Sequence, residues 1–214
     1  MRLASEYFEE IKPSNRALNS RKPIYGVGIN DAPFITNCKV GGKLYSHPAY
    51  VAWKNVLTRS FDQAYATRFP TYQGVRVCDE WLRFSNFLAW WREHQKEGWQ
   101  LDKDLLHRGN KIYSPETCIY IPNWINSFTL TGPKNTSTGR VGAFYCKGRR
   151  KYTSQCGHPI SGEKIRLGYF DSEQEARYYW LKKKTRIAHE LKALMDAIDH
   201  RIYKNVLEII SERR

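Results

Sequence analysis

The chain has 214 residues, of which 41% are hydrophobic and 14% aromatic, a composition that predicts a folded protein. Its 35 Lys and Arg residues outnumber the 21 Asp and Glu residues, which leaves a formal net charge of +14. No apolar run approaches the length of about 18 residues that a transmembrane helix needs, and no signal-peptide pattern opens the sequence. We therefore expect a soluble, cytoplasmic protein with no membrane partner, and the charge favours nucleic acid as its partner.

Two helices are expected in the first half of the chain, after a polar start and a strand-and-turn region. The first runs from Pro48 to about Tyr65, because apolar residues recur there at helical spacing behind a proline suited to a first turn. The second runs from about Glu80 to Lys96, and Gly98 ends it. One face of the second helix is aromatic and is expected in the core; it consists of Trp81, Phe84, Leu88 and Trp91.

The stretch from Leu101 to Asn126 combines a short strand, a polar turn, a second strand and a helix. Its first strand places Asp102 and Asp104 on either side of Lys103. Mg²⁺ prefers oxygen ligands, which these carboxylates and the amide of Asn126 can supply. The sequence therefore predicts a site for a divalent cation and a phosphate, unless the carboxylates only pair with Lys103 and the nearby arginine.

With its "YSPETC" segment, this stretch resembles the HNH endonucleases of bacteriophages. The resemblance implies a hydrolase, similar to a homing endonuclease, that cleaves or nicks double-stranded DNA with Mg²⁺ or Mn²⁺ in the cytoplasm of an infected bacterium. It places Asp102 and Asn126 at the positions of the family's metal ligands. Lys103 falls on the general-base histidine and Thr117 on a conserved asparagine of the family. Lysine is a poor base at neutral pH, so His107 is the alternative base. The candidate catalytic residues are Asp102, Lys103, Asp104, His107 and Asn126.

The five cysteines form no closely spaced pair, and disulfides are not expected in the cytosol. Cys78 and Cys118 recur in the phage family, and His47 lies where relatives often carry a cysteine. The resemblance thus offers His47, Cys78 and Cys118 as ligands of a structural zinc, but Ser60 occupies a further such position and leaves only three ligands. The alternative, which residue chemistry favours, is that the thiols are buried as small apolar groups.

Three strands and a helix are expected after residue 140. The strands are Val141–Cys146, Lys151–Cys156 and Lys164–Phe170, and a capping box from Ser172 to Glu175 starts the helix. The segments "VGAFY" and "KIRLGYFDSEQEARYYW" resemble the AP2 DNA-binding domain, which implies a sheet that enters the major groove. A solvated basic face without a partner is the alternative.

Charge supports a nucleic-acid partner for this region independently. Residues 136–188 contain 12 Lys and Arg against 4 Asp and Glu, a net charge of +8. Because side chains alternate along a strand, these basic residues are expected on one face of the sheet, where they can contact DNA. The candidate DNA contacts are Arg140, Arg149, Arg150, Lys151, Lys164 and Arg166.

The predicted fold is α+β, with a helical, HNH-like ββα-metal module over residues 1–130 and a Gly- and Thr-rich linker over 131–139. The AP2-like module spans 140–189, and a helical extension spans 190–214. One unbroken helix is expected from Ser172 to Ser211, roughly 60 Å long. Its apolar edge predicts packing in a homodimer or back onto the first two helices; the edge consists of Leu191, Leu194, Ile198, Ile202, Val206 and Ile209.

The functional prediction is DNA binding with metal-dependent cleavage. The alternative is a scaffold of the same kind that has lost cleavage and acts as a DNA-binding, regulatory or inhibitory phage protein. RNA binding is a third reading, because the tyrosines and tryptophans could stack on unpaired bases.

Overall fold

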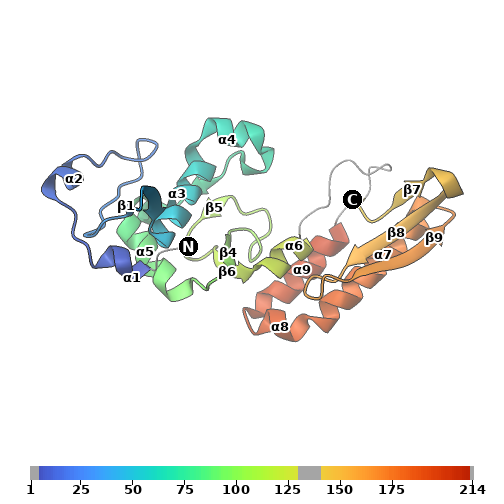
Figure 1. Cartoon of the computed structure of the whole chain (residues 1–214). Coiled ribbons are helices and arrows are strands. Elements are labelled where there is room, and N and C mark those ends of the chain that lie inside the picture. The colour runs from blue at the N-terminus through green and yellow to red at the C-terminus, as the bar shows by residue number, and fades with distance from the viewer. Residues whose placement is uncertain (1–4, 130–140, 213–214) are drawn as a thin grey trace. The chain divides into compact units, whose positions relative to one another are not determined.

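The computed structural model describes residues 5–129 and 141–212, and it contains both helices and strands, which confirms the predicted α+β class (Figure 1). The chain divides into two compact units. The first comprises residues 1–97 and 101–120, and the second comprises residues 98–100 and 121–214. The predicted linker and Arg140 lie outside the described residues.

The first unit is built mainly from short helices and strand pairs. In chain order its elements are α1 (Ser5–Glu9), α2 (Asn15–Asn19), β1 (Asn37–Val40), β2 (Lys43–Ser46), α3 (Pro48–Phe61), α4 (Gln63–Arg68), η1 (Pro70–Tyr72), β3 (Arg76–Val77), η2 (Asp79–Leu82), α5 (Phe84–His94) and β5 (Ile112–Tyr113). Strands β4 (Trp99–Asp102) and β6 (Ile119–Pro122) contain the unit boundaries and form a two-stranded sheet. β1 and β2 are antiparallel, whereas β3 and β5 are parallel.

Large aromatic side chains form the core of the first unit, as the spacing predicted. Trp53 on α3 and Phe84 on α5 are fully buried, with ring centroids 5.4 Å apart. The indole of Trp53 donates to the carbonyl of Trp81 at 2.6 Å, so the one polar atom of this ring is satisfied. Helix α3 ends at Phe61, before the predicted Tyr65, because Asp62 leaves helical geometry and caps α4 by accepting from the Tyr65 amide at 2.9 Å.

The second unit holds the predicted three-stranded sheet. Its elements are α6 (Asn123–Thr129), β7 (Phe144–Cys146), η3 (Lys147–Arg149), β8 (Lys151–Gly157), β9 (Lys164–Phe170), α7 (Glu173–Glu190), α8 (Lys192–Asp196) and α9 (His200–Glu212). The strand order is β7-β8-β9, antiparallel throughout, with a register shift between Ser154 and Gln155. Helix α7 begins at the predicted cap, where the Ser172 hydroxyl accepts from the Glu175 amide at 3.1 Å.

Helix α7 covers one face of this sheet. Ala143, Phe170 and Ala176 form a buried cluster between the sheet and the helix. Gly142 has a φ of +90°, and a Cβ there would overlap the indole of Trp180 on α7. The start of β7 therefore depends on a glycine at this position.

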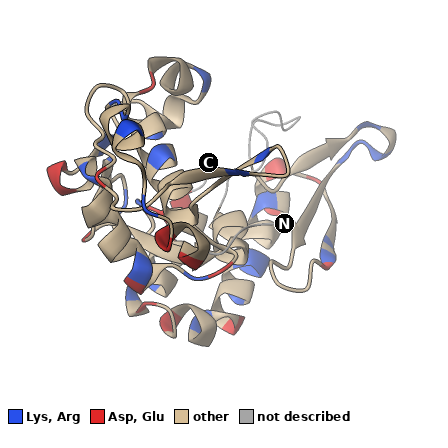
Figure 2. Ribbon diagram, turned by 60° about the vertical axis from the view of Figure 1, so that its left-hand side comes forward, with Lys and Arg blue, Asp and Glu red and all other residues tan. Residues whose placement is uncertain are grey.

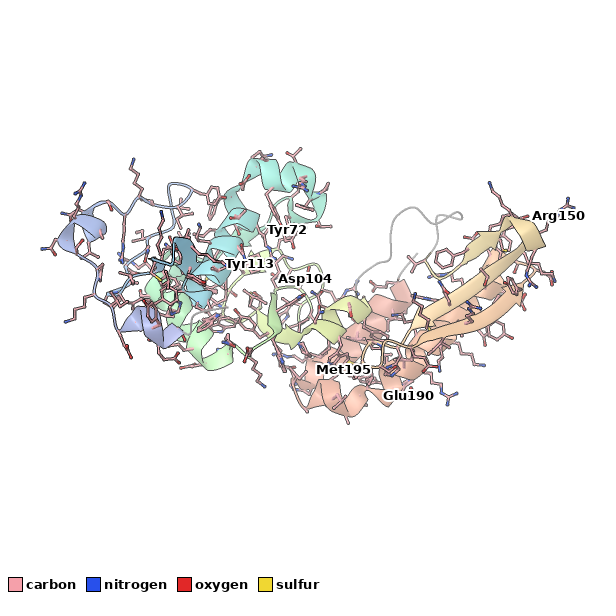
Figure 3. The ribbon with its side chains drawn as sticks, viewed as in Figure 1. Tyr72, Asp104, Tyr113, Arg150, Glu190 and Met195 are labelled. Atoms are coloured by element: carbon pink, nitrogen blue, oxygen red, sulfur yellow. The ribbon has the colours of Figure 1, made fainter. Side chains whose placement is uncertain are left out.

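The predicted unbroken C-terminal helix is wrong. The chain leaves helical geometry after Glu190 and again before His200, and α9 packs against α7 and α8 in the same unit. Asp199 stabilises the second break, because its carboxylate accepts from the Arg201 amide at 2.8 Å at the start of α9. Half of the predicted apolar edge is thus buried within one chain: Leu191, Ile202 and Val206 are buried, as is the neighbouring Met195 (labelled in Figure 3).

The unit boundary also lies earlier than the predicted linker. Helix α6, which the sequence assigned to the first module, packs against α9 in the second unit. Lys184 on α7 donates to the carbonyl of Phe128 at 3.4 Å, and its ammonium lies 3.9 Å from the centroid of the same ring. Among the described residues, no helix combines the length and apolar character needed to cross a membrane.

Candidate functional site

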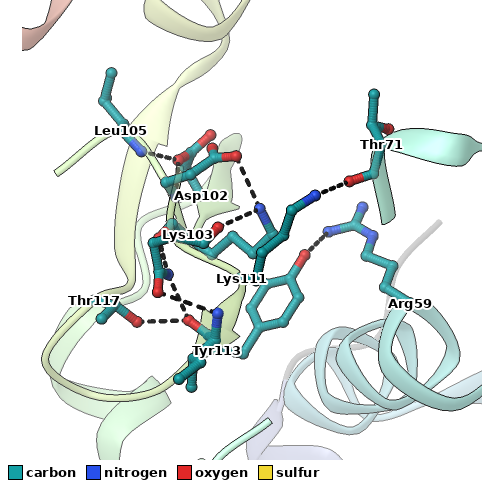
Figure 4. A network of polar contacts seen from close by, with 11 residues as sticks. Arg59, Thr71, Asp102, Lys103, Leu105, Lys111, Tyr113 and Thr117 are labelled. Carbon is teal, nitrogen blue, oxygen red and sulfur yellow. Dashed lines mark hydrogen bonds and ion pairs between the residues drawn. The ribbon is translucent and has the colours of Figure 1, made fainter. Parts of the chain in front are cut away.

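The loop between β4 and β5, which carries Lys103 (labelled in Figure 4), is held by Asn110. The Asn110 amide nitrogen donates to the carbonyls of Lys103 at 2.6 Å and Ile112 at 2.7 Å. Its side-chain oxygen accepts from the Ile112 amide at 3.1 Å. The sequence showed only a turn composition here. Asn110 is the residue that closes the loop, because it joins the loop's two ends.

Asp102 and Asp104 face different donors within this loop. The Oδ1 atom of Asp102 accepts from the backbone amides of Asp104 at 2.9 Å and Leu105 at 2.7 Å. The Oδ2 atom of Asp104 accepts from the ammonium of Lys103 at 2.8 Å. Burial raises the pKa of the Asp102 carboxyl, and the charge of Asp104 adds to this rise.

Lys103, the residue on the predicted general-base position, is buried, with 7% of its surface exposed. Besides Asp104, its ammonium contacts the carbonyl of Asn110 at 3.3 Å and lies 6.0 Å from the ring centroid of Tyr113. In these contacts Lys103 acts as a hydrogen-bond donor and not as a base. The pairing of Lys103 with a carboxylate is the arrangement that the sequence offered as the alternative to catalysis.

The other predicted catalytic residues each have their own surroundings. His107 is exposed on the loop. The hydroxyl of Thr117 donates to the Ile112 carbonyl at 2.7 Å and so supports the turn into β6. Asn126 belongs to the second unit, where its amide nitrogen donates to the side chain of Gln100. Asp102 and Asn126, the two predicted metal ligands, are therefore assigned to different units.

Sequence reasoning missed an arginine and two tyrosines beside the loop. Arg59 on α3 donates to the phenol of Tyr113 at 3.2 Å, and its guanidinium carbon lies 5.4 Å from the ring centroid of Tyr72. Burial raises the pKa of both phenols. Tyr72, Tyr113 and Asp104 are labelled in Figure 3. Arg59 and Tyr113 are 54 positions apart in the sequence, so no local pattern links them.

The loop does not fit a divalent cation in the observed arrangement. A hard cation would take carboxylate oxygens and several waters as ligands. Here the ammonium of Lys103 already compensates Asp104, and two backbone amides satisfy an oxygen of Asp102. Asn110 and Thr117 hold backbone carbonyls of the loop itself.

The three predicted zinc ligands have other surroundings. His47 is buried: its Nδ1 accepts from the Ala49 amide at 3.1 Å, and its Nε2 lies 3.1 Å from a carboxylate oxygen of Glu9. Within residues 5–129 and 141–212, no three His, Cys, Asp or Glu side chains are grouped as metal ligands. Burial raises the pKa of the Cys78 thiol, and that of Cys118 to about 12. Cys118 is buried and Cys78 is half-buried.

The open face of the β7–β9 sheet carries basic and polar side chains. In the register, Gln155 lies opposite Arg166, and Thr153 lies opposite Tyr169. Lys164 is two residues from Arg166 and projects to the same side. Lys164, Arg166 and Tyr169 are exposed. The intervening residues face α7, so the sheet has one covered face and one polar face, as predicted.

The turn between β7 and β8 adds positive charge to this face. Arg149 and Arg150 lie in the turn rather than on a strand, and Figure 2 shows blue at the tip of the hairpin, where Figure 3 labels Arg150. The guanidinium carbon of Arg149 lies 4.6 Å from the ring centroid of Tyr169, which extends the polar face toward the turn. Lys151 forms an exposed ion pair with Asp171 at 2.9 Å.

Comparison with known proteins found no matching family model, no matching curated protein and no matching solved structure. The resemblances to HNH endonucleases and AP2 domains therefore rest on the residues quoted for them. Of the two candidate sites, the sheet presents exposed basic groups. In the loop, Asp102, Lys103 and Asp104 have hydrogen-bond or ion-pair partners within the loop itself.

Proposed function

We propose that the chain is a nucleic-acid-binding protein that contacts double-stranded DNA through the open face of the β7–β9 sheet. The observation that supports this most is the placement of Lys164, Arg166 and Gln155 on one face, with Arg149 beside Tyr169 at its end. Helix α7 covers the other side of the sheet, whereas Gln155, Lys164 and Arg166 are exposed. The exposed charge of this face is thus available to a polyanion.

The dimensions of DNA suit such a surface. The major groove is about 12 Å wide and admits a narrow β-sheet, whose outward side chains then reach base edges. Arginine reads guanine through two parallel hydrogen bonds, and glutamine can read adenine. Arg166 and Gln155, which lie opposite each other at the register shift, are the pair that we assign to base contact. Lys164 and the arginines of the turn would contact phosphates.

We propose binding without cleavage. The residue on the general-base position, Lys103, is buried and paired with Asp104, and Asp102 accepts two backbone amides. These contacts support the reading as a scaffold that binds DNA and regulates or blocks a process on it. Incubation of the protein with supercoiled plasmid in Mg²⁺ and in Mn²⁺ tests this point; accumulation of nicked or linear plasmid would contradict it.

Replacing Arg166 with alanine tests the binding surface. If Arg166 reads a base, the change should cost about 1–3 kcal/mol on the preferred duplex and leave the salt dependence of binding unchanged. Lys164→Ala, at a phosphate contact, should reduce the slope of log affinity against log salt by about 0.9. Arg186→Ala is the matched control, because Arg186 is an exposed arginine on α7 in the same unit. Equal losses in the Arg166 and Arg186 variants would refute the assignment.

A further inference from the structure

Three aromatic rings gather at the surface of the first unit around α4 and η1. The ring centroids of Tyr65 and Phe69 are 4.7 Å apart, and those of Tyr65 and Tyr72 are 5.3 Å apart. We call these three residues the ring cluster. Phe69 is 38% exposed, although a phenylalanine ring is usually buried. The cluster thus exposes part of an aromatic surface to solvent.

Local backbone structure explains how these rings come together. Helix α4 ends at Arg68, where the Phe69 amide donates to the Tyr65 carbonyl at 2.8 Å. Pro70 then starts the short helix η1, since its fixed φ suits a first turn. This turn brings Tyr72 back to the ring of Tyr65. The arrangement is therefore built by the backbone and not by a chance side-chain position.

Positive charge borders the ring cluster. The guanidinium carbon of Arg68 lies 5.3 Å from the ring centroid of Phe69, and that of Arg59 lies 5.4 Å from the centroid of Tyr72. The ammonium of Lys111 donates to the carbonyl of Thr71 at 2.8 Å, beside Tyr72 in the sequence. From residue 63 to 77 the sequence contains two arginines and no Asp or Glu, and the nearest acidic groups are Asp62, which caps α4, and Asp104, whose charge acts on Tyr72. Exposed rings with basic neighbours are complementary to a ligand that has flat apolar faces and negative charge.

We propose that the ring cluster binds single-stranded nucleic acid by stacking unpaired bases on Phe69 and its neighbours. Every base has a π-face, so such stacking tolerates any sequence. Arg68 and Lys111 would contact the adjoining phosphates. This site lies in the first unit and shares no residue with the sheet face, so it does not depend on the duplex-binding proposal.

The test uses the full chain and a single-stranded oligonucleotide that carries one 2-aminopurine, whose fluorescence falls when it stacks on an aromatic ring. We expect quenching by the wild type. Phe69→Ala should weaken single-strand binding about 5- to 150-fold, the equivalent of about 1–3 kcal/mol per stacked base, and should remove the quenching. Phe69→Trp should restore both, because it replaces the aromatic surface.

Phe61→Ala is the matched control. Phe61 is 40% exposed in the same unit but has no ring partner among the described aromatic pairs. This variant should bind and quench as the wild type does, and its urea midpoint should match that of Phe69→Ala. Equal binding by the Phe69 and Phe61 alanine variants, or binding of the wild type without quenching, would overturn the proposal.

Two further arms separate the site from other sources of binding. An oligoribonucleotide of the same sequence measures whether the cluster prefers RNA. Arg166→Ala should weaken duplex binding and leave 2-aminopurine quenching intact, so that failure at the sheet and failure at the ring cluster are distinguishable. Loss of quenching in the Arg166 variant would place the stacked base on the sheet and contradict the assignment to Phe69.

Discussion

The packing of α9 against α7 predicts opposite behaviour for two residues of the same apolar stripe in the sequence. Ile202 on α9 is fully buried, whereas Leu194 on α8 is 51% exposed. Ile202→Ala removes three carbon atoms, each worth about 0.8 kcal/mol of transfer free energy, and the remaining cavity adds to this cost. We therefore expect Ile202→Ala to lower the free energy of unfolding by about 2–5 kcal/mol. Leu194→Ala should change it by less than about 0.5 kcal/mol.

Urea unfolding of both variants, followed by circular dichroism at several protein concentrations, measures these effects. If the stripe is buried within one chain, the midpoints should not depend on protein concentration. A stripe buried in a homodimer would instead give midpoints that rise with concentration. Similar costs for Ile202→Ala and Leu194→Ala, or a midpoint that rises with concentration, would refute the intramolecular packing of α9.

Three other predictions concern single residues. Burial lowers the pKa of His47, and Glu9 opposes this shift, so His47 binds a proton more readily in the unfolded chain than in the folded one. The stability of the protein should therefore fall as the pH drops below the ordinary histidine pKa of about 6.5. His47→Asn should flatten this part of a plot of urea midpoint against pH. Ser172→Ala removes the cap of α7 and should cost about 0.5–2 kcal/mol in urea unfolding, with no loss contradicting the capping role. Lys103→Met removes the ammonium beside Asp104, so calorimetry should detect tighter Mn²⁺ binding than in the wild type. Unchanged binding would show that the ion pair of Lys103 with Asp104 is not what keeps the cation out.

The parts of the fold that sequence predicted are those with a local cause. Alternation and a capping box suffice for β9 and for the start of α7, and both were found as expected. The end of α7 was not predicted, because apolar residues continue at helical spacing through Leu191 and hide the break. That break is stabilised by the packing of α9 on α7, which is a contact between residues far apart in the chain.

In the candidate sites too, sequence predicted what has a local cause and missed contacts between residues far apart in the chain. The shared face of Lys164 and Arg166 followed from the period of a strand, so sequence could predict it. The ion pair of Lys103 with Asp104 was visible only as an alternative. The contact of Arg59 with Tyr113 could not be foreseen, since it depends on the approach of α3 to β5.

The packing of helix α7 limits how the β7–β9 sheet could be transferred to another protein. Ala176 packs on the sheet, while Ile187 and Ala188 are buried farther along the same helix, which also contacts α9. A chimaera that received only residues 140–189 would carry the sheet together with a bare apolar helix end. A chimaera that keeps this end of α7 covered must therefore also carry α8 and α9.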